Sequence, residues 1–123
     1  MLGRRGEQLA ARYLRARHGC NLLYRNFRAP RGGEVDLVCR DDDTLVFVEV
    51  KTRSSLDFGR PAQAVDAEKR ALITRGALAW LRLLDNPDVF FRFDIVEVLV
   101  ERGRPPRCRR LKNAFSLPTP YIY

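Results

Sequence analysis

The chain has 123 residues, of which 46% are hydrophobic and 31% charged, and this fits one globular domain with a single core. No apolar run approaches the roughly 18–20 residues of a membrane-spanning helix, and the N-terminus lacks the apolar region of a signal peptide, so we expect a cytoplasmic protein with no membrane partner. The net charge of +8 favours a nucleic acid as partner, because Lys and Arg side chains that meet phosphates release condensed counterions. A basic surface that serves only solubility is the alternative.

The pattern of apolar, Gly and Pro residues predicts a single domain over 1–123 with seven elements. In chain order these are a helix at 3–17, a short strand at 21–27, a hairpin with strands at 34–40 and 44–51, a helix from about 66 to 84, and strands at 89–100 and 108–115, followed by an extended tail over 115–123.

This order, αβββαββ, predicts an α/β fold in which a mixed sheet is flanked by helices. The strand at 89–100 is apolar on both faces and should be internal, whereas 108–115 should lie at an edge. Because a helix separates 44–51 from 89–100, these two strands should run parallel.

The hairpin carries charges inside otherwise apolar strands: Glu34 and Asp36 on the first strand, Glu49 and Lys51 on the second. Each pair shares one face of its strand, since side chains alternate. A loop of two or four residues would place Asp36 opposite Glu49, and we expect four because the turn lacks the Gly of a tight primed turn. An odd loop would send the two pairs to opposite faces.

Neighbouring carboxylates on one face repel unless a cation lies among them. Mg²⁺ suits such oxygen ligands, and a lysine beside it can orient water or stabilise the charge that develops on a phosphate. Only three of the 23 basic residues are lysines, so Lys51 within an apolar strand points to a site that needs a compact charge. The alternative is a plain ion pair between Glu49 and Lys51.

Asp36 and the run Glu49-Val50-Lys51 resemble the PD-(D/E)xK nuclease signature. The stretches GEQLAARYL, RNFR, GGEVDLV, LVFVEVKTR, RFDIVEV and NAF are together similar to the YraN-like family of uncharacterised small bacterial proteins, over Gly6 to Phe115. The resemblance implies a restriction-endonuclease-like core similar to archaeal Holliday junction resolvases. It also implies that Asp36, Glu49 and Glu7 hold metal and that Lys51 is catalytic with them. Val35 stands where the literal motif has Pro.

Other charged residues have two interpretations each. Glu7 lies on the inward stripe of the first helix but could also complement the helix dipole. We expect Glu34 to be the partner of Lys51, and Asp94 to form a structural ion pair with Arg92. Three further residues are candidate nucleic-acid contacts, although a solvated role is the simpler interpretation for each: Arg53, Gln63 and Lys69.

These residues predict an endonuclease that uses Mg²⁺ or Mn²⁺ to hydrolyse phosphodiester bonds in DNA, either branched or damaged. Symmetric cutting of two strands would require a homodimer. A non-catalytic nucleic-acid-binding module on the same fold is the first alternative, and a protein-interaction factor with an incidental basic surface is the second.

Overall fold

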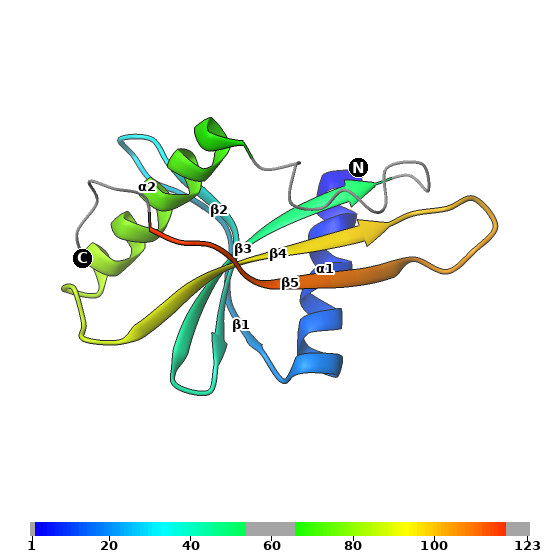
Figure 1. The fold of residues 1–123 in the computed structure, drawn as a ribbon, viewed down its shortest axis with the longest axis horizontal. Helices are drawn as coiled ribbons and strands as arrows, with labels where there is room; N and C mark the ends of the chain where they lie inside the picture. Colours follow the sequence, from blue (N-terminus) through cyan, green and yellow to red (C-terminus); the bar gives the residue numbers. More distant parts are fainter. Residues whose placement is uncertain (1, 54–65, 118–123) are drawn as a thin grey trace.

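The computed structural model describes residues 2–53 and 66–117, and it has the predicted α/β architecture (Figure 1). Seven elements follow one another: α1 (Leu2–His18), β1 (Asn21–Arg28), β2 (Glu34–Asp41), β3 (Thr44–Arg53), α2 (Ala67–Leu83), β4 (Phe90–Leu99) and β5 (Arg107–Phe115). The last residues of the predicted tail, 118–123, lie outside the described part of the chain.

The five strands form one mixed sheet in the order β1-β2-β3-β4-β5. β3 and β4 are parallel, as the intervening helix predicts, and the other neighbours are antiparallel. β4 is internal and β5 is an edge strand, which confirms both predictions.

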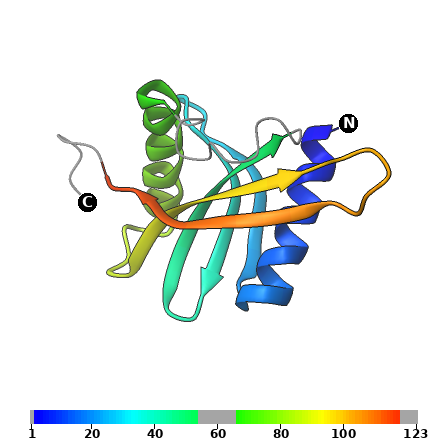
Figure 2. The ribbon, with the colours of Figure 1, turned by 45° about the vertical axis from the view of Figure 1, so that its right-hand side comes forward.

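The two helices pack on opposite faces of the sheet (Figure 2). Side chains alternate along β3, so Phe47 joins the core under α2 while Val46 and Val48 join the core under α1. Among the described residues, no helix is long and apolar enough to cross a membrane.

The predicted even register of the hairpin is confirmed, but its predicted loop length is wrong. The ladder between β2 and β3 runs from Leu37 opposite Val48 to Asp41 opposite Thr44, so the loop contains two residues rather than four. Asp42 adopts a left-handed φ of 57°, which Asp tolerates better than most side chains. An Asp at the turn can therefore replace the Gly whose absence had favoured a longer loop.

Helix α2 touches the start of β2 backbone to backbone, and two glycines make this possible. A Cβ on Gly76 would lie 2.9 Å from the backbone N and C of Glu34, and a Cβ on Gly33 would lie 2.5 Å from the backbone N of Gly76. Asp66 caps the same helix by accepting a hydrogen bond from the backbone N of Lys69 at 2.9 Å. The cap and the glycine contact together hold the first turn of α2 over the charged part of the hairpin.

Gly76→Ala tests this contact through the sign of its effect. In an exposed helix the change would stabilise by about 1 kcal/mol, because Ala is the better helix former. Here the methyl group would collide with backbone, so we expect the free energy of unfolding to fall by about 1–3 kcal/mol in urea titrations. A gain in stability would contradict the close approach.

Candidate active site

The hairpin opens at Asp36, and this opening creates the site. The last paired residues of the ladder are Leu37 and Val48. Beyond them, Asp36 Oδ2 accepts a hydrogen bond from the backbone N of Val50 at 2.8 Å. One oxygen of this carboxylate thus replaces the main-chain partner that β2 no longer supplies, and the side chain is held beside β3.

Glu49 is the buried member of the site, with only 3% of its surface exposed. Burial, followed by the charge of Asp36 and a hydrogen bond with it, raises the pKa of Glu49 to about 8. A buried carboxylate next to another carboxylate is unfavourable, so this pair retains a proton or requires a cation. The even register therefore produces the neighbouring acids that the sequence predicts.

Glu7 reaches the same place from helix α1. It lies beyond the first helical turn, which contains no acidic residue, so a role at the helix dipole is not supported. Its Oε1 atom is buried and has no hydrogen-bond partner in the part of the chain that the structure describes. Burial and the negative charge of Asp36 raise the pKa of Glu7, whereas a hydrogen bond with Asn26 acts in the opposite direction.

A small polar hollow of about 70 Å³ lies between these elements and is lined by residues that include Glu7, Asn26, Glu34 and Asp36. A space of this size can hold water or a partly hydrated ion. It is the place in the described structure where α1 and the open end of the hairpin meet.

Two lysines neutralise the carboxylates. Lys51 Nζ lies 3.7 Å from Glu49 Oε2, and Lys69 Nζ lies 3.6 Å from the same atom. Lys69 is also bonded to Glu34 Oε1 at 2.9 Å. The expected pairing of Glu34 with Lys51 is therefore wrong: Lys69 takes this place because α2 holds its first turn against the start of β2, and Arg28 binds the other oxygen at 3.0 Å.

The remaining candidates lie apart from this cluster or have other partners. Arg53 is on the same face of β3 as Glu49, but its Nε lies 3.5 Å from the fully buried Glu97. Asp94 is paired with Arg92 at 3.0 Å, which confirms the structural ion pair. Gln63 lies outside the described residues.

Sequence reasoning missed Glu97 and understated Lys69. Glu97 is bonded to Arg109 Nη2 at 2.7 Å and lies beside Lys51 in the parallel ladder. The sequence does contain a pattern that points to Glu97, since Val96-Glu97-Val98 repeats Val48-Glu49-Val50 of the neighbouring strand. The position of Lys69 depends on how α2 docks, and no local pattern shows this.

The types of donor, though not their spacing, suit a hard divalent cation. Glu7, Asp36 and Glu49 are carboxylates, and Oε1 of Glu7 has no hydrogen-bond partner among the described residues. Within residues 2–53 and 66–117, no three acidic, His or Cys side chains lie in an arrangement that could hold a metal ion by themselves. Mg²⁺ and Mn²⁺ could be held here by one or two of these carboxylates with water in the other positions, as Mg²⁺ commonly is.

Comparison with known proteins places the chain among bacterial relatives. The profile of the uncharacterised protein family UPF0102 matches residues 6–98. The chain belongs to the UPF0102 family. It is 50% identical over 114 residues to a UPF0102 protein of Nocardia farcinica, covering 93% of this chain and 88% of the relative. It is 48% identical over 118 residues to a UPF0102 protein of Geobacter sulfurreducens, covering 95% and 90%. All three names give a family and no activity, so a function for this UPF0102 member has to be argued from its site.

The raised pKa of Glu49 predicts that the protein loses stability as pH rises. The folded state keeps a proton up to about pH 8, whereas the unfolded chain loses it near the ordinary value of 4.5. The free energy of unfolding should therefore fall by about 2–4 kcal/mol from this group between these two pH values. Urea titrations in EDTA measure this, and Glu49→Gln should flatten the profile. An equally steep profile in the variant would contradict the assignment.

Lys69→Met tests the second cation of the cluster. Removing it leaves Glu34 and the buried Glu49 with less compensating charge, so we expect a loss of about 1–3 kcal/mol, larger at pH 8 than at pH 5 because Glu49 ionises in between. Lys112→Met is the matched control, because Lys112 is exposed and should change stability by less than about 0.5 kcal/mol. Equal effects of the two substitutions would contradict the role of Lys69.

Proposed function

We propose that this UPF0102 protein is a Mg²⁺- or Mn²⁺-dependent endonuclease that hydrolyses phosphodiester bonds in DNA, with branched or damaged DNA as substrate. The observation that carries the proposal is that Asp36 lies beside both Glu7 and the buried Glu49, with the ammonium group of Lys51 next to Glu49. Carboxylates that gather where their charges repel indicate a cation, and a lysine next to them indicates an anionic substrate. The likeness of these residues to the PD-(D/E)xK signature supports a restriction-endonuclease-like superfamily.

The chemistry assigns a role to each side chain. A bound Mg²⁺ supplies Lewis-acid polarisation of a phosphoryl oxygen and lowers the pKa of water. Asp36 and Glu49 would hold it, and Oε1 of Glu7, which has no partner within residues 2–53 and 66–117, would bind water or complete the site. Lys51 would donate hydrogen bonds to the attacking water and to the phosphate as negative charge builds on it. Water loses a proton as it adds to phosphorus, one P–O bond of the backbone breaks, and the leaving oxygen takes up a proton, so a phosphodiester and water give a phosphate monoester and a hydroxyl group.

The location and assembly of the enzyme follow from the same proposal. The chain carries three cysteines without metal or disulfide spacing, which suits the reducing cytoplasm. A reaction that cuts two strands of a symmetric junction would use a homodimer with one site in each copy.

Binding of Mn²⁺ tests the metal site before any substrate is known. Titration followed by electron paramagnetic resonance should give an affinity at least about tenfold weaker in Asp36→Asn and in Glu49→Gln than in wild type, because each change removes a ligand charge. Asp42→Asn is the matched control, since Asp42 lies at the exposed turn far from the site. An Mn²⁺ affinity that is unchanged in both site variants would contradict a metal site at these residues.

Cleavage is tested with a panel of labelled single-stranded, duplex, flap and four-way DNA in Mg²⁺ or Mn²⁺. Lys51→Ala should lower the single-turnover rate by about 10²–10³-fold, while circular dichroism shows that the fold is retained and the Mn²⁺ affinity stays near that of wild type. Cleavage that survives in Lys51→Ala would contradict its role.

A non-catalytic nucleic-acid-binding module is the second candidate. One observation favours it: the carboxylates already have lysine partners, with Lys69 bonded to Glu34 and near Glu49. Binding of DNA by wild type without cleavage of any substrate in the panel, together with a steep dependence on salt, would select this function.

A further inference from the structure

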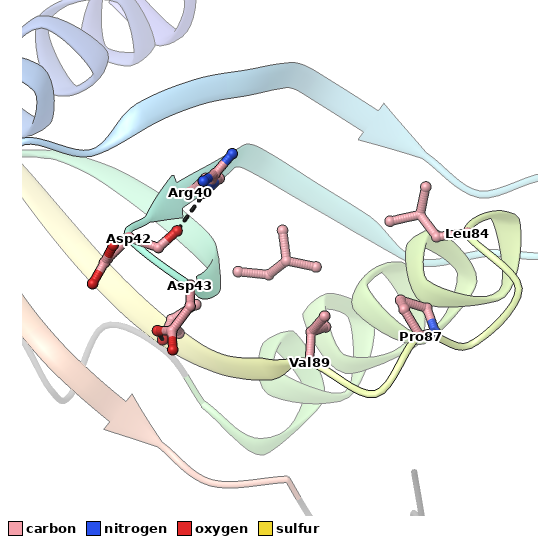
Figure 3. A pocket seen from close by; sticks show the side chains of 8 residues that line it. Arg40, Asp42, Asp43, Leu84, Pro87 and Val89 are labelled. Carbon is pink, nitrogen blue, oxygen red and sulfur yellow. Dashed lines mark hydrogen bonds between the residues drawn. The ribbon is translucent and has the colours of Figure 1, made fainter.

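Positive charge is distributed unevenly over this chain. At the start of β3, a hollow of about 340 Å³ is lined by Leu84, Val89 and the exposed Asp42 and Asp43 (Figure 3). Neither aspartate has a cationic partner among the described residues, where Arg40 donates its hydrogen bond to the backbone oxygen of Asp42. A polyanion would be repelled here. Glu49 and Lys51 lie further along β3, about 15–25 Å away at the usual rise per residue.

A second hollow, of about 530 Å³, lies between α1 and the first residues of β5. Arg12, Tyr13 and Arg17 line it from the helix, and Arg107 lines it from the strand. The β4–β5 hairpin runs past α1 (Figure 2). Residues 106–108 of this hairpin line the groove opposite the helix. The α1–β5 groove, defined by these four residues, is thus basic on both walls.

The arginines of the groove are available to an anion. Arg12 and Arg17 are exposed, and neither has an ion pair within the described part of the chain. Arg107 is paired with Glu101 at 3.0 Å, but its side chain is 59% exposed, so a phosphate could compete for it. Burial and then the charges of Arg110 and Arg17 lower the pKa of His18, whereas Asp41 and Asp94 raise it, so basic and acidic side chains both lie near this end of the groove.

The groove lies on the face of the sheet that α1 covers, whereas Lys51 and Arg53 lie on the face that α2 covers, because they alternate with Val50, which packs under α1. Arg53, Leu99 and Arg107 are consecutive partners across β3, β4 and β5. Strands lie about 4.8 Å apart, so the main chains of Arg53 and Arg107 are separated by about 10 Å. Helix α1 connects the groove to the candidate site, since Arg12 in the groove lies five residues after Glu7, and Glu7 lies close enough to Asp36 to feel its charge. A DNA backbone that reaches Asp36 from the side of α1 could therefore continue along the groove.

We propose that the α1–β5 groove binds the phosphate backbone of the DNA next to the bond that is cut, with Arg12, Arg17 and Arg107 as phosphate contacts. This rests on the proposed nuclease function and names the surface that would hold its substrate. The contacts carry no base recognition, because guanidinium groups on phosphates position a duplex without reading its sequence. An acidic protein segment is the other occupant that the charge would allow, and the test separates the two.

The experiment compares two double variants that each remove two positive charges. The groove variant, Arg12→Ala with Arg17→Ala, removes the positive charges on the α1 side of the groove. The control, Arg40→Ala with Arg82→Ala, removes two exposed arginines elsewhere. Binding of a fluorescent duplex and a four-way junction is followed by anisotropy in EDTA at several salt concentrations. The groove variant should bind about 10–30-fold more weakly near 0.1 M salt, with a salt slope lower by about two, and the control should change by less than about threefold.

The outcomes distinguish failure of the groove from failure of the nuclease. Equal weakening of DNA binding in both double variants, or no weakening in the groove variant, would overturn the proposal that the groove binds DNA, even if wild type cleaves DNA. DNA binding that depends on the groove, without cleavage of any substrate, would support the groove as a DNA-binding surface and overturn the proposed nuclease activity. If wild type does not bind DNA, both the DNA-binding groove and the nuclease function would be overturned, and an acidic protein segment would remain as the ligand of the groove. Unchanged Mn²⁺ affinity and an unchanged urea midpoint in the groove variant are expected, and they show that the loss arises at the groove.

Discussion

The hydrogen bond from the backbone N of Val50 to Asp36 is the constraint on which the rest of the site depends. It lies where β2 leaves the ladder, so the strands can separate without exposing an unpaired main-chain donor. It also holds Asp36 close enough to the buried Glu49 to raise the pKa of Glu49. A regular hairpin continued through this point would use Val50 for a ladder bond and leave less room for Glu7 and the polar hollow.

The two helices then complete the site from opposite faces of the sheet. Helix α1 brings Glu7, one of whose oxygens has no partner among the described residues. Helix α2 brings Lys69, whose ammonium group lies between Glu34 and Glu49. The glycine contact between Gly33 and Gly76 fixes the second of these positions. Burial of opposed carboxylates costs stability, and it is tolerated where a function needs the charge.

The order of elements, the parallel pairing of β3 with β4 and the even register of the hairpin were predictable, because each follows from local patterning and chain connectivity. The errors have local causes as well. The loop length was wrong because Asp42 occupies a left-handed conformation usually associated with Gly or Asn. The partner of Glu34 was wrong because register alone cannot account for a lysine that arrives from a helix 35 residues away in sequence.

The sequence by itself determined that Glu49 and Lys51 share one face of their strand, since side chains alternate. That Asp36 lies beside Glu49 was a prediction that depended on an even turn, which the structure supplies. Only the tertiary structure decided that Glu7 faces this cluster, that Lys69 takes Glu34 as its partner, and that Glu97 is buried between Arg53 and Arg109. These relations join elements that are distant in the chain, and their geometry is set by helix docking and strand order. Periodicity reports which face a side chain occupies, whereas packing decides what that face meets.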